Sequence, residues 1–193
     1  MHHIYHTEGL ILGGSDFGEA SRRYAIFTRE LGLVYARASG VRKMSSKLRF
    51  ILQDFAYVKV DLVQGKNFWR VTSASKTSRL EQLVKNPAKL AIFAEVARLL
   101  ARLLPAAERN DVLFTELLDG LALLERAEAK ENLPNIEAVI VLRALAALGY
   151  IGENAALDNL LKLPLRAELL VQVSTRRSLV LRHINQALRE SHL

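Results

Sequence analysis

Apolar and polar positions alternate in short runs through the first 80 residues, and this period of two is typical of half-buried β-strands. The clearest run is Phe55–Val63, whose predicted inward face is Ala56, Val58, Val60 and Leu62. The pattern predicts five strands, at Ile4–Leu12, Arg22–Thr28, Leu33–Ala38, Phe55–Val63 and Phe68–Ser75. We expect a loop at Gly13–Glu19 and a hairpin turn at Gln64–Asn67.

Five antiparallel strands in so short a segment suit a small closed barrel. The long excursion between the third and fourth strands, with one helical turn expected near Lys47–Leu52, fits an OB-type barrel, which has this strand count. An SH3-like barrel stays open as an alternative, because strand order cannot be deduced from the sequence.

After Pro87 the apolar period changes to that of amphipathic helices. Helices are expected at Ala88–Leu104, from Asp111 to about Ala129, from Pro134 to Gly149, at Asp158–Leu163, after Pro164, and after a cap at Ser174 or Thr175. The last helix has an apolar stripe of Val180, Leu181, Ile184 and Leu188. The sequence therefore predicts an α+β chain of two domains: an OB-fold barrel at 1–80 and an all-α bundle at 81–193.

Charge is distributed unevenly between these two parts. Residues 1–80 contain 13 Lys/Arg and six Asp/Glu, whereas residues 81–193 contain 14 of each, so the net charge of +7 falls on the barrel part. Such asymmetry indicates an acidic partner for that part. Nucleic acid is the first candidate, and an anionic membrane surface is the second.

The densest positive charge lies in the segment Arg37–Gln53, which contains no acidic residue. Its five cations are Arg37, Arg42, Lys43, Lys47 and Arg49. Small and polar residues between them predict a surface loop suited to contact phosphates. The alternative is a solvated charge run that binds nothing.

Aromatic residues stand beside cations on the predicted strands, an arrangement that suits base stacking combined with phosphate contacts. Tyr35, Tyr57, Phe68 and Trp69 lie near Arg37, Lys59, Lys66 and Arg70. Tyr57 is the strongest stacking candidate, because its strand position is opposite the apolar face. The alternative is that these rings pack in the core or between domains.

Most catalytic and metal chemistry is disfavoured. The chain has no cysteine, which excludes disulfides and thiolate metal sites and fits a reducing cytosol. No P-loop, Ser elbow or H-E-x-x-H motif is present. No apolar run is long enough to span a membrane, and the first residues lack the apolar region of a signal peptide. We expect a cytoplasmic protein that is not an enzyme and has no cofactor or metal.

Five short motifs stand in the order and spacing of a known bacterial family. They are Glu8–Leu12, Asp16–Glu19, Thr28–Gly32, Ser39–Lys43 and Leu52–Phe55, followed more weakly by Leu142–Tyr150 and Ser174–Arg177. With them the chain resembles the recombination mediator RecO. It departs from the family at Ser39, where Lys is usual, and at Asp54, where Pro is usual. It also lacks the four-cysteine zinc site of many members.

The resemblance implies an OB-fold followed by a helical domain without a catalytic centre. It implies binding of single- and double-stranded DNA, annealing of complementary strands, and loading of recombinase together with RecR and the acidic C-terminal tail of single-strand binding protein, in a nucleoid-associated protein. The expected DNA-binding residues are Arg37, Arg42, Lys43, Lys47, Arg49, Tyr57, Lys59, Lys66 and Arg70.

We expect a partner site on the helical side. Its residues are Arg176, Arg177, Arg182 and Arg189. On the last helix, Arg182, Gln186 and Arg189 share a face next to Ile184 and Leu188, which an acidic tail with apolar residues could use. The alternative function is a protein–protein adaptor whose basic barrel is incidental.

Overall fold

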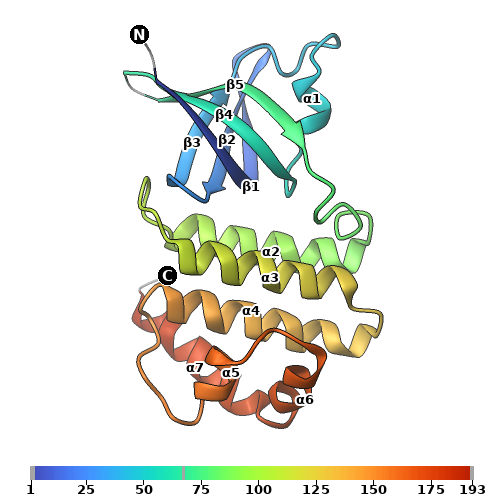
Figure 1. Cartoon of the computed structure of the whole chain (residues 1–193), viewed down its shortest axis with the longest axis vertical. Helices are drawn as coiled ribbons and strands as arrows, with labels where there is room; N and C mark the ends of the chain where they lie inside the picture. The colour runs from blue at the N-terminus through green and yellow to red at the C-terminus, as the bar shows by residue number, and fades with distance from the viewer. Residues whose placement is uncertain (1–2, 67, 192–193) are drawn as a thin grey trace. The chain divides into compact units, whose positions relative to one another are not determined.

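The computed structural model describes residues 3–66 and 68–191 (Figure 1). Asn67, part of the expected hairpin turn, lies outside them. The chain divides into two compact units, Met1–Asp111 and Val112–Leu193. The first contains the strands and one long helix, and the second is helical.

The five strands close into a barrel in the order β1-β2-β3-β5-β4. They are β1 (Ile4–Phe17), β2 (Ser21–Thr28), β3 (Gly32–Ala38), β4 (Tyr57–Gln64) and β5 (Trp69–Lys76). Neighbours pair antiparallel except β3 and β5, which pair parallel over a short stretch. This is the OB-type barrel, so that expectation is confirmed over the SH3-like alternative.

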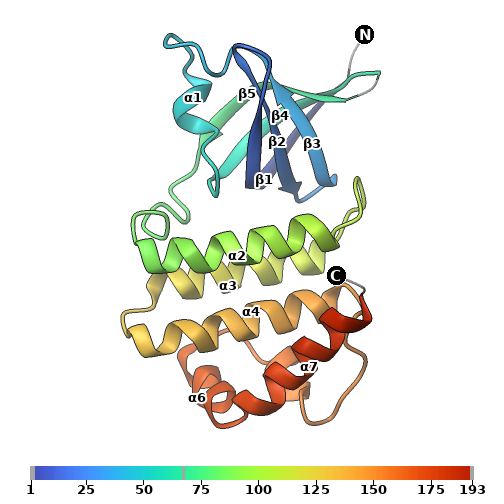
Figure 2. The same cartoon turned by 180° about the vertical axis from the view of Figure 1, so that it is seen from behind.

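The barrel interior follows the predicted alternation. Val58, Val60 and Leu62 of β4 meet alternate residues of β3, Val34, Ala36 and Ala38, in one buried cluster. Along the chain, the short helix α1 (Leu48–Ile51) follows β3 and precedes β4, which confirms the helical turn expected near Lys47–Leu52. It contacts β5 (Figure 2).

The expected loop at Gly13–Glu19 is wrong for most of its length, because β1 continues to Phe17. A register shift between Ile11 and Gly13 places a β-bulge there, and Gly13 has φ +152°, which favours glycine. Beyond the bulge the polar residues pair with β2, and Phe17 lies opposite Ser21. Pairing with a neighbouring strand overrides the loop propensity of this glycine-rich segment.

The first unit extends past the barrel through α2 (Pro87–Leu103). The Asn86 side chain accepts hydrogen bonds from two amides of the first turn, and α2 packs against β1. After α2 the chain returns to β3, where the Ala107 amide donates to the Leu33 carbonyl over 2.8 Å. Gly32, at φ +66°, faces the backbone of Glu108 so closely that any Cβ would collide with it. We call residues 104–108 the strap. That residues 1–80 form a domain by themselves stays a prediction.

The second unit is organised around α4, which packs against α5, α6 and α7. Its helices are α3 (Asp111–Arg126), the 3₁₀ turn η1 (Lys130–Asn132), α4 (Leu133–Ala147), α5 (Asp158–Lys162), α6 (Ala167–Thr175) and α7 (Arg177–Glu190). As expected, α4 ends just before Gly149, which has φ +80°. No helix in the described ranges is long and apolar enough to cross a membrane.

Two helix boundaries differ from the expected ones. α6 begins at Ala167 and not at Pro164, and Ser174 and Thr175 lie inside α6 instead of capping α7. Thr175 donates its hydroxyl back to the Gln172 carbonyl over 3.0 Å, so its side chain is engaged in its own helix.

One buried arginine joins three segments of the second unit. Arg143 of α4 is 5% exposed, and its Nη1 donates to Glu116 Oε2 of α3 over 2.7 Å. Its Nε donates to the Leu160 carbonyl over 2.9 Å, and its Nη2 donates to the Leu163 carbonyl. All three nitrogens therefore have partners, which is the condition for burying a guanidinium.

Candidate nucleic-acid interface

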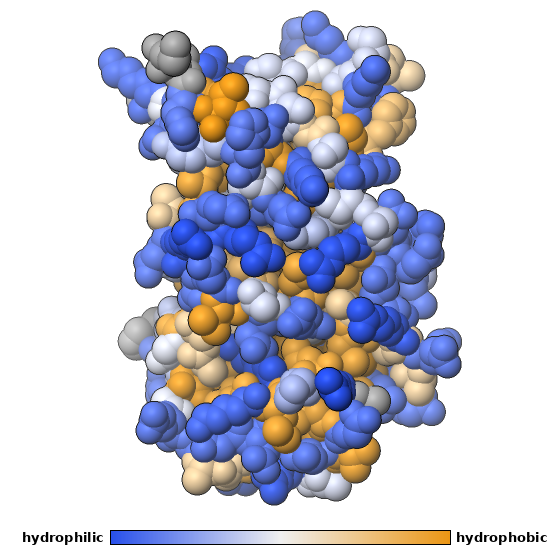
Figure 3. Space-filling model, in the orientation of Figure 1, coloured by the Kyte–Doolittle hydropathy of each residue, from blue (hydrophilic) through white to orange (hydrophobic). Residues whose placement is uncertain are grey.

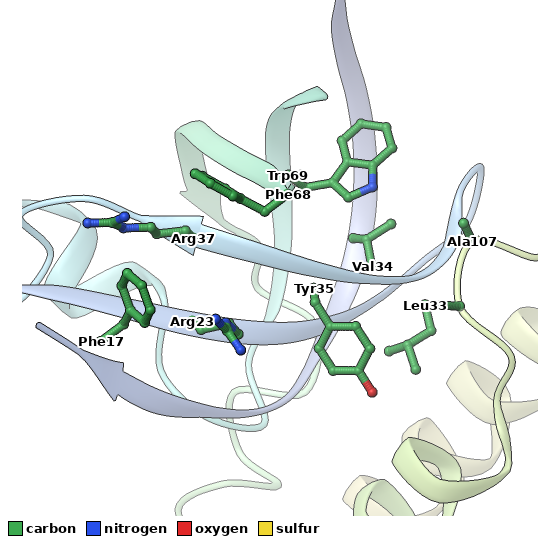
Figure 4. Close-up of a pocket in the computed structure, with 10 residues that line it drawn as sticks. Phe17, Arg23, Leu33, Val34, Tyr35, Arg37, Phe68, Trp69 and Ala107 are labelled. Atoms are coloured by element: carbon green, nitrogen blue, oxygen red, sulfur yellow. The ribbon is translucent and has the colours of Figure 1, made fainter. Parts of the chain in front are cut away.

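Exposed hydrophobic residues lie among hydrophilic ones over both units (Figure 3), so exposure alone does not locate a site. A groove of about 560 Å³ on the outer face of the first unit locates a candidate site (Figure 4). It is lined by Phe17, Arg23, Leu33, Val34, Tyr35, Arg37, Phe68, Trp69, Ala106 and Ala107. Its floor is β3, and the ends of β1 and β5 and the strap surround it.

Three arginines stand in register on neighbouring strands, and two of them, Arg23 and Arg37, line the groove. Arg23 of β2 pairs with Arg37 of β3, and Arg37 pairs with Arg70 of β5. We call these three residues the arginine row. Neighbouring strands are about 4.8 Å apart, so the three side chains leave the sheet close together. Like charges opposite each other destabilise a sheet, and an anion bound across them relieves the repulsion.

Aromatic rings flank the arginine row. Phe17, Tyr35 and Phe68 are 39%, 46% and 47% exposed. The Arg37 guanidinium carbon lies 4.4 Å from the centroid of the Phe17 ring, and that of Arg23 lies 5.2 Å from it. Trp69 is held edge-on against Tyr5 at 5.2 Å between centroids, so it forms a fixed wall. The groove thus combines flat apolar surfaces with positive charge.

The Arg37 guanidinium is only partly hydrogen-bonded within the described residues. Its Nη2 donates to Ser21 Oγ at the long distance of 3.4 Å. Its Nε is buried and has no hydrogen-bond partner among the described residues. An unpaired buried donor costs about 1–3 kcal/mol. The face of Phe17 compensates for part of this cost, and an anion in the groove would offer Arg37 a stronger partner.

We call the segment between β3 and β4 the basic loop. It places its cations on the surface, as expected, whereas Arg37, the first cation of the predicted loop, lies on β3. Arg42, Lys43, Lys47 and Arg49 are all exposed. The expectation that no acid neutralises them is wrong for Arg42, whose Nη1 lies 3.3 Å from Asp16 Oδ2. Asp16 comes from β1, far away in the sequence, so a count of charges within the loop could not reveal the pair.

The stacking role predicted for Tyr57 is not compatible with its position. Tyr57 is 3% exposed, and its hydroxyl donates to Glu8 Oε2 over 2.6 Å. Burial, followed by this hydrogen bond, raises the pKa of Tyr57 to about 12. The strand period correctly excluded Tyr57 from the barrel interior, but it could not show that the segment containing Thr77 and Arg79 covers the outer face.

The other predicted DNA contacts separate into two groups. Arg37 and Arg70 belong to the arginine row, whereas Lys59 is exposed on β4 opposite Glu8 and Lys66 is exposed in the β4–β5 turn. Arg23 and Phe17, which line the groove, were not among the expected contacts. The register of the β2–β3 hairpin, counted outward from its glycine turn, would have placed Arg23 opposite Arg37. Phe17 gave no such signal, because it was assigned to a loop.

On the helical side, the predicted partner residues Arg176, Arg177, Arg182 and Arg189 are exposed. Arg176 donates to the Ala156 carbonyl over 3.1 Å. Ile184 is 6% exposed, so the expectation that it offers apolar contact to a partner is wrong. Gln186 donates to Glu190, which places an acid beside the cationic face. No cluster of three or more metal-ligating side chains occurs among the described residues.

The strand order and the groove over β2 and β3 place the barrel in the OB class, whose corresponding face binds oligonucleotides or oligosaccharides. The family model described as recombination protein O N terminal matches residues 1–79. Residues 1–79 therefore belong to the RecO family, and the relatives that align with about three quarters of the chain carry the same family name.

The relatives are bacterial proteins named DNA repair protein RecO. The protein of Heliobacterium modesticaldum is 33% identical over 150 residues, which cover 78% of this chain and 53% of that protein. That of Synechocystis is 30% identical over 149 residues, or 77% of this chain and 55% of that protein. That of Frankia casuarinae is 33% identical over 158 residues, which cover 81% of this chain and 63% of that protein. The chain spans about half the length of most of these relatives.

Proposed function

We propose that this chain is a DNA-binding mediator of repair and recombination, and that its first unit holds DNA. The observation that carries the proposal is a groove in which Arg23 and Arg37 lie beside three exposed aromatic rings, with Arg70 in register next to Arg37. Arginines contact phosphates without reading sequence, so binding should be nearly independent of base sequence. The names of the relatives support a role in DNA repair.

The basic loop extends the proposed interface. Arg42, Lys43, Lys47 and Arg49 are exposed and follow β3 in the chain, and Lys59 and Lys66 add further exposed cations on the barrel. These side chains add electrostatic attraction to any polyanion, and that attraction weakens as salt is added. Arg42 contributes less than its neighbours, because Asp16 already pairs with it.

We further propose that the protein works without catalysis and without a metal. It anneals complementary strands and helps to load recombinase together with RecR and single-strand binding protein. It does so in the cytoplasm, in association with the nucleoid. The exposed arginines at 176, 177, 182 and 189 are the proposed contact for an acidic partner segment. These roles rest on family membership and on the position of the cations.

The test uses the purified full chain. Fluorescent single-stranded and duplex oligonucleotides of mixed sequence are titrated at two salt concentrations, and annealing of complementary strands is followed in parallel. We expect binding that varies little with sequence and weakens strongly with salt. Absence of binding at low salt, with the fold intact by circular dichroism, would contradict the proposal and favour the protein–protein adaptor.

A further inference from the structure

The groove has features that phosphate binding alone does not require. Phe17, Tyr35 and Phe68 expose their rings around one groove, although they come from three separate segments of the first unit. Single exposed apolar residues are common on protein surfaces, but several that surround one hollow indicate a ligand. A volume of about 560 Å³ also falls within the range of small-molecule sites.

Exposed aromatic rings interact differently with single-stranded and duplex DNA. In a duplex, base faces are covered by their neighbours and only base edges are accessible in the grooves of the helix. An aromatic ring can stack only on a base that is unpaired or has been turned out of the helix, and turning it out is unfavourable. Rings that surround a groove are therefore useful to a protein that binds single strands.

The arginine row provides the complementary contact for the phosphates of the same strand. Arg23 and Arg37 both lie over the ring of Phe17, so this ring is already in a cationic environment. Tyr35 is two residues from Arg37 on the same face of β3, and Phe68 comes two residues before Arg70. Bases on these two rings would place their phosphates within reach of the row.

The strap limits the groove. Ala106 and Ala107 line it next to Leu33, to which the Ala107 amide is hydrogen-bonded. The strap is held there by the close approach of Gly32 to Glu108. A DNA strand in the groove therefore meets the strap at the end where β3 begins. The Phe17 end of the groove is remote from the strap (Figure 4).

We propose that this groove is a subsite for unpaired nucleobases, formed by Tyr35 and Phe68 as stacking surfaces with the arginine row on the phosphates. It selects single strands, whereas the exposed cations of the basic loop hold single-stranded and duplex DNA alike. This inference rests on the proposed function, because it assigns DNA forms to two parts of the same interface.

The first test needs no substitution. Trp69 is the only tryptophan of the chain, and it forms a wall of the groove. Single-stranded oligonucleotides should change Trp69 emission in proportion to binding, whereas duplex of the same length should bind with little change. An equal change with both forms, or no change when single strands are shown to be bound, would overturn the inference.

The second test replaces the rings and keeps their apolar character. Tyr35→Leu plus Phe68→Leu should lower single-strand affinity about tenfold or more, leave duplex affinity within about twofold, and leave the salt slope unchanged, since stacking releases no counterions. The matched control is Tyr150→Leu in the second unit, an aromatic that is 37% exposed and does not line the groove, and it should have no effect on either form.

The outcomes separate the two proposals. Equal loss for both DNA forms, or no loss for either, overturns the base subsite while DNA binding itself stands. If the unsubstituted chain binds neither form, the proposed function fails. Circular dichroism of each variant checks the fold, and the Trp69 measurement on the unsubstituted chain remains decisive if a variant does not fold.

Discussion

The two units of this chain use arginine in opposite ways. In the second unit, Arg143 is buried and each of its three nitrogens donates to a carboxylate or a carbonyl. In the first unit, Arg37 stands between two other arginines, and within the described part of the chain it has one long hydrogen bond and an Nε without a partner. A guanidinium with all its partners inside the fold stabilises that fold. A row of guanidiniums that forms no ion pair with any described acid is better explained by a ligand that supplies the negative charge.

This contrast predicts its largest effect at Arg143. Arg143→Met should lower the free energy of unfolding of the second unit by about 3–5 kcal/mol, because Glu116 and two carbonyls lose their buried donor. Urea denaturation followed by circular dichroism measures the loss. The matched substitution Arg126→Met, at an exposed position on α3, should change stability by less than about 0.5 kcal/mol. Similar losses in both variants would show that Arg143 is not a structural link.

A smaller effect is expected where the first unit does bury a polar pair. Tyr57→Phe should cost about 1–3 kcal/mol of stability, because Glu8 loses the hydroxyl that donates to it. DNA affinity should stay unchanged, since Tyr57 does not line the groove. A loss of single-strand affinity without a loss of stability would mean that the Tyr57 hydroxyl takes part in DNA binding, which its burial argues against.

The raised pKa of Tyr57 adds a pH dependence to this prediction. The unfolded chain releases the tyrosine proton near pH 10, whereas the folded chain holds it up to about 12. Stability from this group is therefore complete below pH 10 and is lost as the pH rises from 10 to 12. Tyr57→Phe should make the unfolding free energy less dependent on pH in that window, compared with the unsubstituted chain measured in parallel.

The smallest effect is expected in the basic loop. Arg42→Gln plus Lys43→Gln should weaken binding of all DNA sequences alike and flatten the slope of log K against log salt. Each full phosphate contact on a single strand contributes about −0.7 to that slope. Because Arg42 is already paired with Asp16, the change should be closer to one contact than to two. A change of two full contacts would mean that DNA displaces Asp16, and no change would remove the loop from the interface.

The sequence predicted the parts of the fold that depend on local periodicity. The alternation in Phe55–Val63 identified the inward residues of β4, and Gly149 marked the end of α4, because both follow from residue pattern and backbone preference. The extension of β1 to Phe17 was missed, since it depends on pairing with β2. Periodicity also says nothing of what covers an outer face, which explains the error at Tyr57.

The candidate site was partly predictable for the same reason. Composition placed the excess positive charge in the first 80 residues, and Arg37 and Arg70 were among the expected contacts. The grouping of these residues into a row with Arg23 depends on strand register, and β3 meets β5 through a parallel pairing that joins distant segments. The pairing of Arg42 with Asp16 is equally non-local. The number of charges could be counted from the sequence, but the residues that lie beside each charge could not be identified from it.

The central claim is that the arginine row holds DNA, and the salt dependence of single-strand binding tests it most directly. The full chain and a variant with Arg23→Gln, Arg37→Gln and Arg70→Gln are titrated with one fluorescent oligonucleotide at several salt concentrations, with Arg126→Gln on α3 as the control. If each arginine neutralises one phosphate, the triple variant should bind more weakly and its slope should be flatter by about 2, while the control matches the unsubstituted chain. A correctly folded triple variant with unchanged affinity and slope would contradict the account.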